Sequence, residues 1–140
     1  MYIFDTDHLS LIQRNGQEGK KILAKLTDVD KTVAVTVITY EEQVRGRLSF
    51  LSKARTPEEQ VIAYQGLQQL AVDYRSILIL PFTHTAILEY QRLRKSYPRL
   101  GSMDLKIAAV ALTNKAILLT RNTLDFGQIL ELQIDDWAKG

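Results

Sequence analysis

The sequence predicts an α/β fold with three layers, in which helices cover both faces of a central, mostly parallel sheet of four to five strands. Short apolar segments alternate along the chain with longer stretches of helical periodicity. Strands that alternate with helices favour a parallel sheet that is buried on both faces. No internal repeat, low-complexity tract or linker interrupts the pattern, so residues 1–140 are expected to form one domain.

The strands are predicted from short runs of apolar residues. Residues 32–37 give the clearest signal, because β-branched side chains alternate along this segment. The other strands are expected at residues 2–4, 77–80 and 116–119, with a short fifth strand at 132–134.

Capping residues and prolines predict where the helices begin and end. Thr39 and Glu42 match a capping box, which predicts a helix from this point to about residue 53. Ser102 can cap a later helix, whose interior is apolar nearly all round and is expected to pack against the sheet. The other helices are expected over residues 7–14, 19–26, 56–74 and 85–97, the last of which ends before Pro98.

Composition limits the classes of function. The 140 residues are 46% hydrophobic and 24% charged, which is ordinary for a globular domain. Cysteine is absent, which excludes disulfides, thiolate nucleophiles and cysteine-based zinc sites and suits a reducing cytoplasm. Neither a signal peptide nor an apolar run of membrane-spanning length is visible. We therefore expect a cytoplasmic protein that does not contact a membrane.

Acidic side chains follow the predicted strands or lie at the start of the helices beside them. Asp5 follows the first strand, while Glu42 and Asp104 lie near helix starts. In parallel sheets, ligand crevices form outside the carboxyl ends of the strands. Carboxylates gathered there repel one another unless a cation neutralises them, and oxygen ligands favour magnesium or manganese. Such an ion, held by few carboxylates, can activate water against a phosphodiester, so the sequence predicts a metal-dependent nuclease.

Each of these acids also has a structural explanation. Asp5 could cap the following helix, but Thr6 and Asp7 could cap it equally well, so Asp5 is expected to be free for a ligand. Asp7 is expected to cap or to support the site. Glu42 is explained as well by the capping box, and Asp104 by the helix dipole.

Four short motifs resemble the PIN-domain family, in particular the VapC-type toxins of bacterial toxin–antitoxin pairs. They occur in the family's order and span nearly the whole chain. The motifs are Ile-Phe-Asp-Thr-Asp-His-Leu from residue 3, Val-Ile-Thr-Tyr-Glu-Glu-Gln-Val-Arg-Gly from residue 37, Leu-Gly-Ser-Met-Asp-Leu-Lys-Ile-Ala-Ala from residue 100, and Leu-Leu-Thr-Arg-Asn-Thr-Leu-Asp-Phe from residue 118.

The resemblance implies a PIN-like α/β/α fold and an endoribonuclease that uses Mg²⁺ or Mn²⁺ to cut structured or single-stranded RNA, with transfer RNA among the candidate substrates. By motif, Asp5, Glu42 and Asp104 form the acidic core, and Asn122 stands uncharged at the fourth position. Asp125 could supply the missing carboxylate, which leaves one or two metal ions open. The side chains expected to orient the acids are Thr6, Asp7, Thr39, Ser102 and Thr120.

The resemblance also implies partners. A cognate antitoxin protein is expected to mask the site, and a homodimer is common in such toxins. Cleavage by water is expected to leave a 5′-phosphate and a 3′-hydroxyl.

Three alternatives stay open from the residues alone. A haloacid-dehalogenase-like phosphatase would use Asp5 as nucleophile and Asp7 as acid–base, although little chain remains after Thr120 for the rest of its site. Metal-independent RNA cleavage would use His8 and His84 as acid and base. A catalytically degenerate domain that binds RNA or protein without cutting is suggested by the amide of Asn122.

Overall fold

Within residues 1–29 and 31–139, which the computed structural model describes, five short strands form one sheet. They lie in the order β3-β2-β1-β4-β5, and every pairing is parallel, so the predicted α/β class is confirmed. The strands are β1 (Tyr2–Phe4), β2 (Val33–Thr36), β3 (Ile79–Leu80), β4 (Ile117–Leu119) and β5 (Gln133–Asp135).

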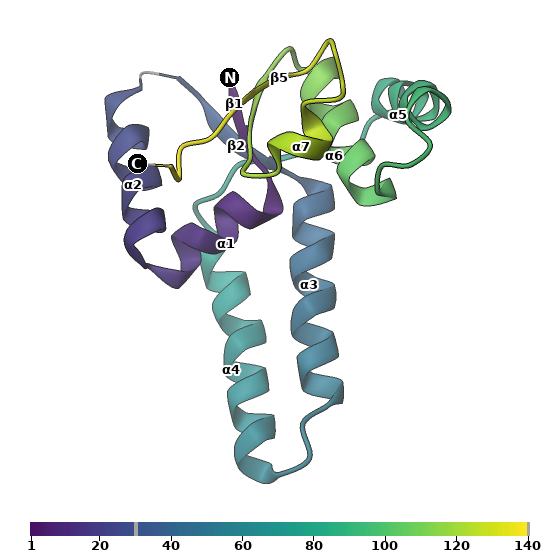
Figure 1. The fold of residues 1–140 in the computed structure, drawn as a ribbon. Coiled ribbons are helices and arrows are strands. Elements are labelled where there is room, and N and C mark those ends of the chain that lie inside the picture. Colours follow the sequence, from purple (N-terminus) through teal and green to yellow (C-terminus); the bar gives the residue numbers. More distant parts are fainter. Residues whose placement is uncertain (30, 140) are drawn as a thin grey trace.

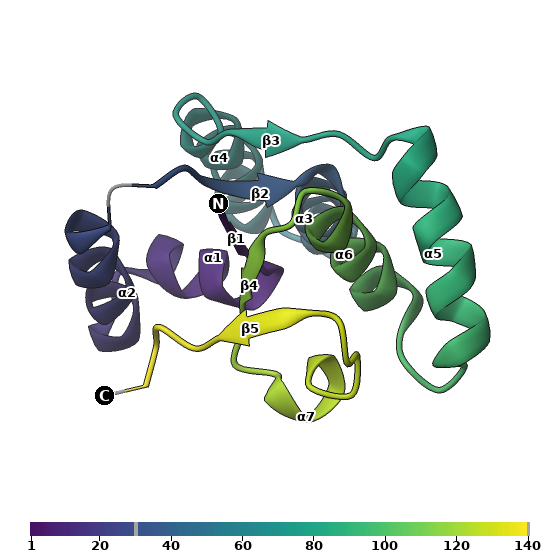
Figure 2. The same ribbon diagram turned by 90° about the horizontal axis from the view of Figure 1, so that it is seen from above.

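Helices flank the sheet on both faces. Figure 2 shows α1 and α2 on the opposite side of the sheet from α5 and α6. The helices α3 and α4 pack against each other as a hairpin that projects away from the sheet (Figure 1). The helices are α1 (Thr6–Arg14), α2 (Gln17–Asp28), α3 (Val37–Ser52), α4 (Pro57–Asp73), α5 (His84–Ser96), α6 (Ser102–Thr113) and α7 (Thr123–Phe126). In the described ranges, none of the helices is long and apolar enough to cross a membrane.

The alternation of side chains along the strands divides the core into two clusters. Ile3 packs in the cluster that α6 dominates, whereas its neighbour Phe4 packs with α1, α2 and Trp137 on the other face. Along α6, every residue from 107 to 111 is buried, which confirms the expectation of an interior helix. The central strands are thus packed on both faces, which positions the side chains at the strand ends.

The helix caps predicted at Thr39 and Ser102 are wrong. Thr36 caps α3 by accepting a hydrogen bond from the Thr39 N–H at 3.2 Å, so Thr39 and Glu42 do not form a capping box. The helix begins directly after β2, because the last residue of the strand is itself a good cap. Likewise α6 begins at Ser102 with Gly101 at the cap position, and the Ser102 hydroxyl lies 2.9 Å from that of Tyr90.

Candidate active site

The crevice predicted at the edge of the sheet lies where the strand order reverses. The chain runs from β1 outward through β2 and β3, then returns to place β4 on the other side of β1. Open parallel sheets bind ligands at such a switch point, outside the carboxyl ends of the strands. Asp5 follows β1 directly, and its N–H donates to Leu119 O at the end of β4, at 3.0 Å.

A pocket of about 320 Å³ at this edge brings the predicted residues together. Glu42 reaches it from the second turn of α3, Asp104 from the first turn of α6, and Asn122 from the segment after β4. Its lining consists of Asp5, Thr6, Asp7, Ser10, Glu42, Asp104, Ile107, Asn122 and Phe126. Four motifs that are far apart in the sequence therefore share one cavity.

Asp5 is both the cap of α1 and a wall of the pocket. Its Oδ1 accepts the peptide N–H of His8 at 2.8 Å, so the expectation that Thr6 or Asp7 caps this helix is wrong. Burial raises the pKa of Asp5 to about 6, against the opposing effect of hydrogen bonds from His8 and the Thr120 hydroxyl. The charges of Asp7 and Asp104 raise this pKa further. A cation in the pocket would relieve both penalties.

Glu42 is held by hydroxyl groups rather than by a helix start. The Thr6 hydroxyl lies 2.7 Å from Glu42 Oε1 and 3.0 Å from the Thr39 hydroxyl, which is fully buried. With the capping box ruled out, Glu42 has no helix-capping role, and its carboxylate faces the pocket.

Asp104 is a second carboxylate in the pocket whose ionised form is disfavoured. Burial raises its pKa, and the charges of Glu42 and Asp125 raise it further. Two further carboxylates, Glu42 and Asp125, therefore act electrostatically on Asp104 at the start of α6.

The side chain of Asn122 makes two hydrogen bonds with Asp125. It caps α7, where its Oδ1 accepts the Asp125 N–H at 3.4 Å and its Nδ2 donates to Asp125 Oδ2 at 3.1 Å. The Asn122 N–H in turn donates to the Thr120 hydroxyl at 2.9 Å. Asp125 does not line the pocket, although its charge acts on Asp104.

Other predicted residues lie at the rim or outside. Asp7 lines the pocket and pairs with Arg121 at 3.3 Å, an ion pair that the sequence did not suggest although Arg121 lies within the last motif. Ser102 is exposed beside Tyr90 and does not line the pocket.

The two histidines do not form an acid–base pair. His8 is fully buried, and burial lowers its pKa, whereas His84 is exposed at the start of α5. Metal-independent cleavage by these two side chains therefore has no structural support.

The acidic pocket suits an ion that keeps part of its water shell. Its charged donors are carboxylate oxygens, which fit Mg²⁺ or Mn²⁺ better than zinc or copper. Among the described residues, no group of three or more His, Cys, Asp or Glu side chains is arranged to enclose an ion by itself. Magnesium bound by one or two carboxylates, with water and substrate phosphate completing its shell, needs no such enclosure.

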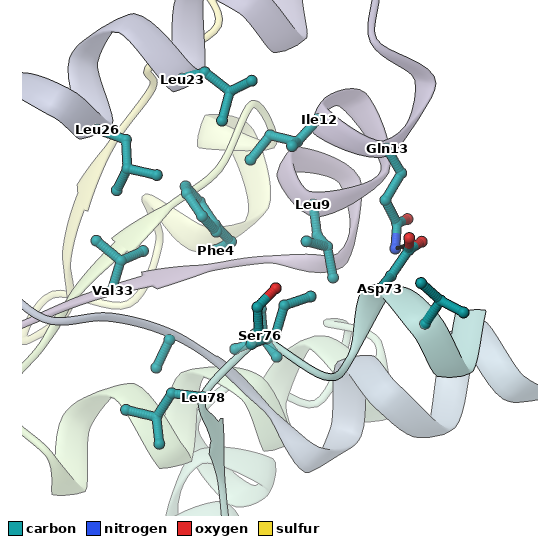
Figure 3. A pocket seen from close by; sticks show the side chains of 14 residues that line it. Phe4, Leu9, Ile12, Gln13, Leu23, Leu26, Val33, Asp73, Ser76 and Leu78 are labelled. Carbon is teal, nitrogen blue, oxygen red and sulfur yellow. Dashed lines mark hydrogen bonds between the residues drawn. The ribbon is translucent and has the colours of Figure 1, made fainter. Parts of the chain in front are cut away.

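A larger pocket on the other side of α1 has a different character. It measures about 600 Å³ and is walled mainly by apolar side chains of β1, α1, α2, β2 and the segment after α4, among them Phe4, Leu9 and Leu26 (Figure 3). None of the predicted acids lines it. Among the described residues that line it, this pocket has no cluster of carboxylates that could hold a metal ion for phosphodiester hydrolysis.

Comparisons with known proteins found similar sequences and similar folds. Ribonuclease VapC1 of Haemophilus influenzae strain R2866 is 28% identical in an alignment 147 positions long, which covers 99% of this chain and 99% of the relative. Among solved structures, VapBC-1 from nontypeable H. influenzae has a TM-score of 0.77 at 24% identity, covering 99% of this chain and 98% of the other. VapBC2 from Rickettsia felis, bound to a promoter DNA fragment, has a TM-score of 0.77 at 22% identity, covering 97% and 98%. The PIN domain family model matches residues 2–129, and the chain therefore belongs to the PIN domain family.

Proposed function

We propose that this protein is a metal-dependent endoribonuclease that acts as the toxin of a VapC-type toxin–antitoxin pair. The observation that carries the proposal is the convergence of Asp5, Glu42 and Asp104 on one pocket at the β1–β4 edge. RNA is the proposed substrate because the relative that matches along its whole length is named a ribonuclease. Transfer RNA is the substrate class to test first.

Asp5 and Asp104 are the proposed metal-binding carboxylates, with Glu42 next to them. Burial and mutual repulsion raise the pKa values of Asp5 and Asp104, so both gain most from a nearby cation. Bound Mg²⁺ or Mn²⁺ would polarise the phosphoryl oxygen and lower the pKa of a coordinated water. Thr6 orients Glu42, and Thr120 orients Asp5. Attack by water rather than by the 2′-hydroxyl leaves a 5′-phosphate and a 3′-hydroxyl.

The proposed protein partner is a cognate antitoxin. The similar solved structures from H. influenzae and R. felis are VapBC complexes. The hairpin of α3 and α4 also exposes large apolar side chains, as surfaces that bind other proteins often do. These side chains are Leu48, Phe50, Val61, Ile62 and Tyr64. A homodimer, which the resemblance implies, and a cytoplasmic location, which the composition suggests, belong to the same proposal.

Cleavage of end-labelled total transfer RNA tests the proposal. The purified protein is incubated with Mg²⁺, with Mn²⁺ or with EDTA, beside Asp104→Asn and the control Asp28→Asn, which changes an exposed carboxylate on α2. We expect discrete fragments with 5′-phosphate ends from the wild type and the control, and none in EDTA or from Asp104→Asn. Cleavage that persists in EDTA would contradict a metal mechanism.

A binding domain without activity is the second candidate, and Asn122 is the observation that favours it. In that case manganese should give no calorimetric signal. The haloacid-dehalogenase alternative is not carried further, because Asp7, its required acid–base, is an exposed rim residue paired with Arg121, and the chain belongs to the PIN domain family.

A further inference from the structure

The imidazole of His8 lies between the acidic pocket and the C-terminal segment, and the proposed chemistry gives it no task. His8 is fully buried, with Nδ1 3.7 Å from Asp5 Oδ1. Its Nε2 accepts the peptide N–H of Trp137 at 3.1 Å, across 129 positions of sequence. The Trp137 ring packs against Phe4 and Tyr2. His8 therefore connects an acid of the pocket to the segment after β5.

The hydrogen bond from Trp137 decides which nitrogen of His8 carries the proton. A neutral imidazole has one N–H and one lone pair, and a peptide N–H can be accepted only by the lone pair. Nε2 is therefore unprotonated, and the proton lies on Nδ1, the nitrogen that faces Asp5. Asp136 Oδ1 lies 3.6 Å from Nε2 but accepts the Ala138 N–H at 2.8 Å. Burial favours the neutral ring by lowering the pKa of His8.

The Nδ1–H group is a buried donor without a partner. Among the described residues, Nδ1 is a buried side-chain atom that makes no hydrogen bond. Asp5 Oδ1 lies just outside bonding distance and accepts the His8 peptide N–H instead. Because an unsatisfied buried donor is costly, a small rotation of the Asp5 carboxylate that brings an oxygen within bonding distance of Nδ1, and keeps the bond from the His8 peptide N–H, stabilises the protein.

We propose that His8 is a positioning residue for Asp5, whose carboxylate is oriented in the pocket by the Nδ1–H group while Trp137 holds the ring in the required tautomer. This inference rests on the proposed function, since the orientation of Asp5 matters most when Asp5 binds a cation. The C-terminal segment thereby becomes part of the support of the active site, although none of residues 136–139 lines the pocket.

Nitrogen-15 NMR of the histidine side chains in the full-length protein tests the tautomer and its link to the pocket. We expect the His8 proton on Nδ1, and an Nδ1 signal that moves when Mg²⁺ is added, while the exposed His84 does not respond. A proton on Nε2 would overturn the inference. The inference would also be overturned if Mg²⁺ shifts the backbone amide signals of Glu42 and Asp104, recorded on the same sample, but leaves the His8 signal unchanged. No shift at Glu42 or Asp104 would instead overturn the proposed metal site, and the inference with it.

Two variants separate positioning of Asp5 from support of the C-terminal segment. In His8→Asn the amide group lies near the position of Nδ1, and in His8→Gln it lies near that of Nε2, so each retains one of the two contacts. We expect His8→Asn to keep its Mn²⁺ affinity and His8→Gln to lose about tenfold in calorimetry, even if both unfold at lower temperature. The reverse order would show that His8 serves only to hold Trp137. If either variant fails to fold, the NMR test on the wild type still decides.

Discussion

The Thr6 hydroxyl lies 2.7 Å from Glu42 Oε1, which joins the first turn of α1 to the second turn of α3. The two residues are 36 positions apart, and each follows a different strand of the sheet. The charge of Glu42 raises the pKa of Asp104, so the position of the Glu42 carboxylate affects how readily Asp104 ionises. A threonine hydroxyl is thus the contact that sets the geometry of an acidic side chain.

Replacing Thr6 by valine removes this contact at nearly constant volume. We expect Thr6→Val to lower Mn²⁺ affinity and RNA cleavage by about 10- to 100-fold, as loss of a group that orients a metal-binding carboxylate usually does. Calorimetry and a cleavage assay measure the two effects. Thr27→Val is the matched control, because the Thr27 hydroxyl bonds only locally, to Ala24 O at the surface. Equal loss in both variants would contradict a specific role for Thr6.

The raised pKa of Asp5 predicts how the stability of the metal-free protein changes with pH. The pKa rises from 3.8 to about 6 on folding, so the folded state binds more protons than the unfolded state between these values. The contribution of Asp5 to the free energy of unfolding must therefore fall as pH increases through this window, by on the order of 3 kcal/mol, with the full loss present above pH 6. The raised pKa of Asp104 adds a change of the same sign.

The variant Asp5→Asn isolates this effect. Asparagine keeps the α1 cap but cannot ionise, so we expect a variant that is more stable than the wild type at pH 7 and less sensitive to pH. Urea unfolding in EDTA at several pH values measures both quantities. If the variant is less stable than the wild type at pH 7, the buried charge of Asp5 does not destabilise the folded protein.

A carboxylate in place of the amide at position 122 should lower the stability of the metal-free protein and raise its metal affinity. Asn122→Asp loses the Nδ2 donation to Asp125 Oδ2 at 3.1 Å and sets two carboxylates against each other. We expect a lower melting temperature without metal, tighter binding of Mn²⁺, and recovery of the lost stability when Mn²⁺ is added.

The control for this exchange is Asn114→Asp. The Asn114 amide donates to Val110 O at 2.8 Å at the far end of α6, so its loss also destabilises the protein. Manganese should not restore that loss. Recovery in both variants would point to general ion binding rather than to the pocket.

The approach of α2 to α1 depends on Gly19. A Cβ atom at this position would overlap the carbonyl oxygen of Leu11, which is backbone and cannot move aside. We expect Gly19→Ala to lower stability by about 1–3 kcal/mol, as overpacking does. At Gly46, within α3, a Cβ meets nothing within 4 Å, so Gly46→Ala should instead stabilise by about 0.5–1 kcal/mol. Thermal unfolding of both variants gives the comparison.

Local patterns in the sequence predicted the class of every strand and helix except the short α7 (Thr123–Phe126), which they missed, and they were less reliable for where the helices start. At the start of α4, Thr56 and Glu59 form a capping box and Pro57 is the first helical residue, so the helix expected over residues 56–74 has strong local start signals. The same signature at Thr39 failed, because Thr36 at the end of β2 was already placed to cap. Spacing alone cannot distinguish the two threonines, since the end of β2 depends on its pairing with a strand that is distant in the sequence.

The sequence by itself determined the α/β class and the chain positions at which acids follow strands, because periodicity and capping act over a few neighbouring residues. Only the tertiary structure decided which of those acids share a pocket, since strand order and burial depend on contacts between distant segments. It brought Asp5, Glu42 and Asp104 together, left Ser102 outside, and placed Trp137 against His8. The pKa shifts have the same origin, because burial and opposing charge exist only once the sheet and its helices have packed.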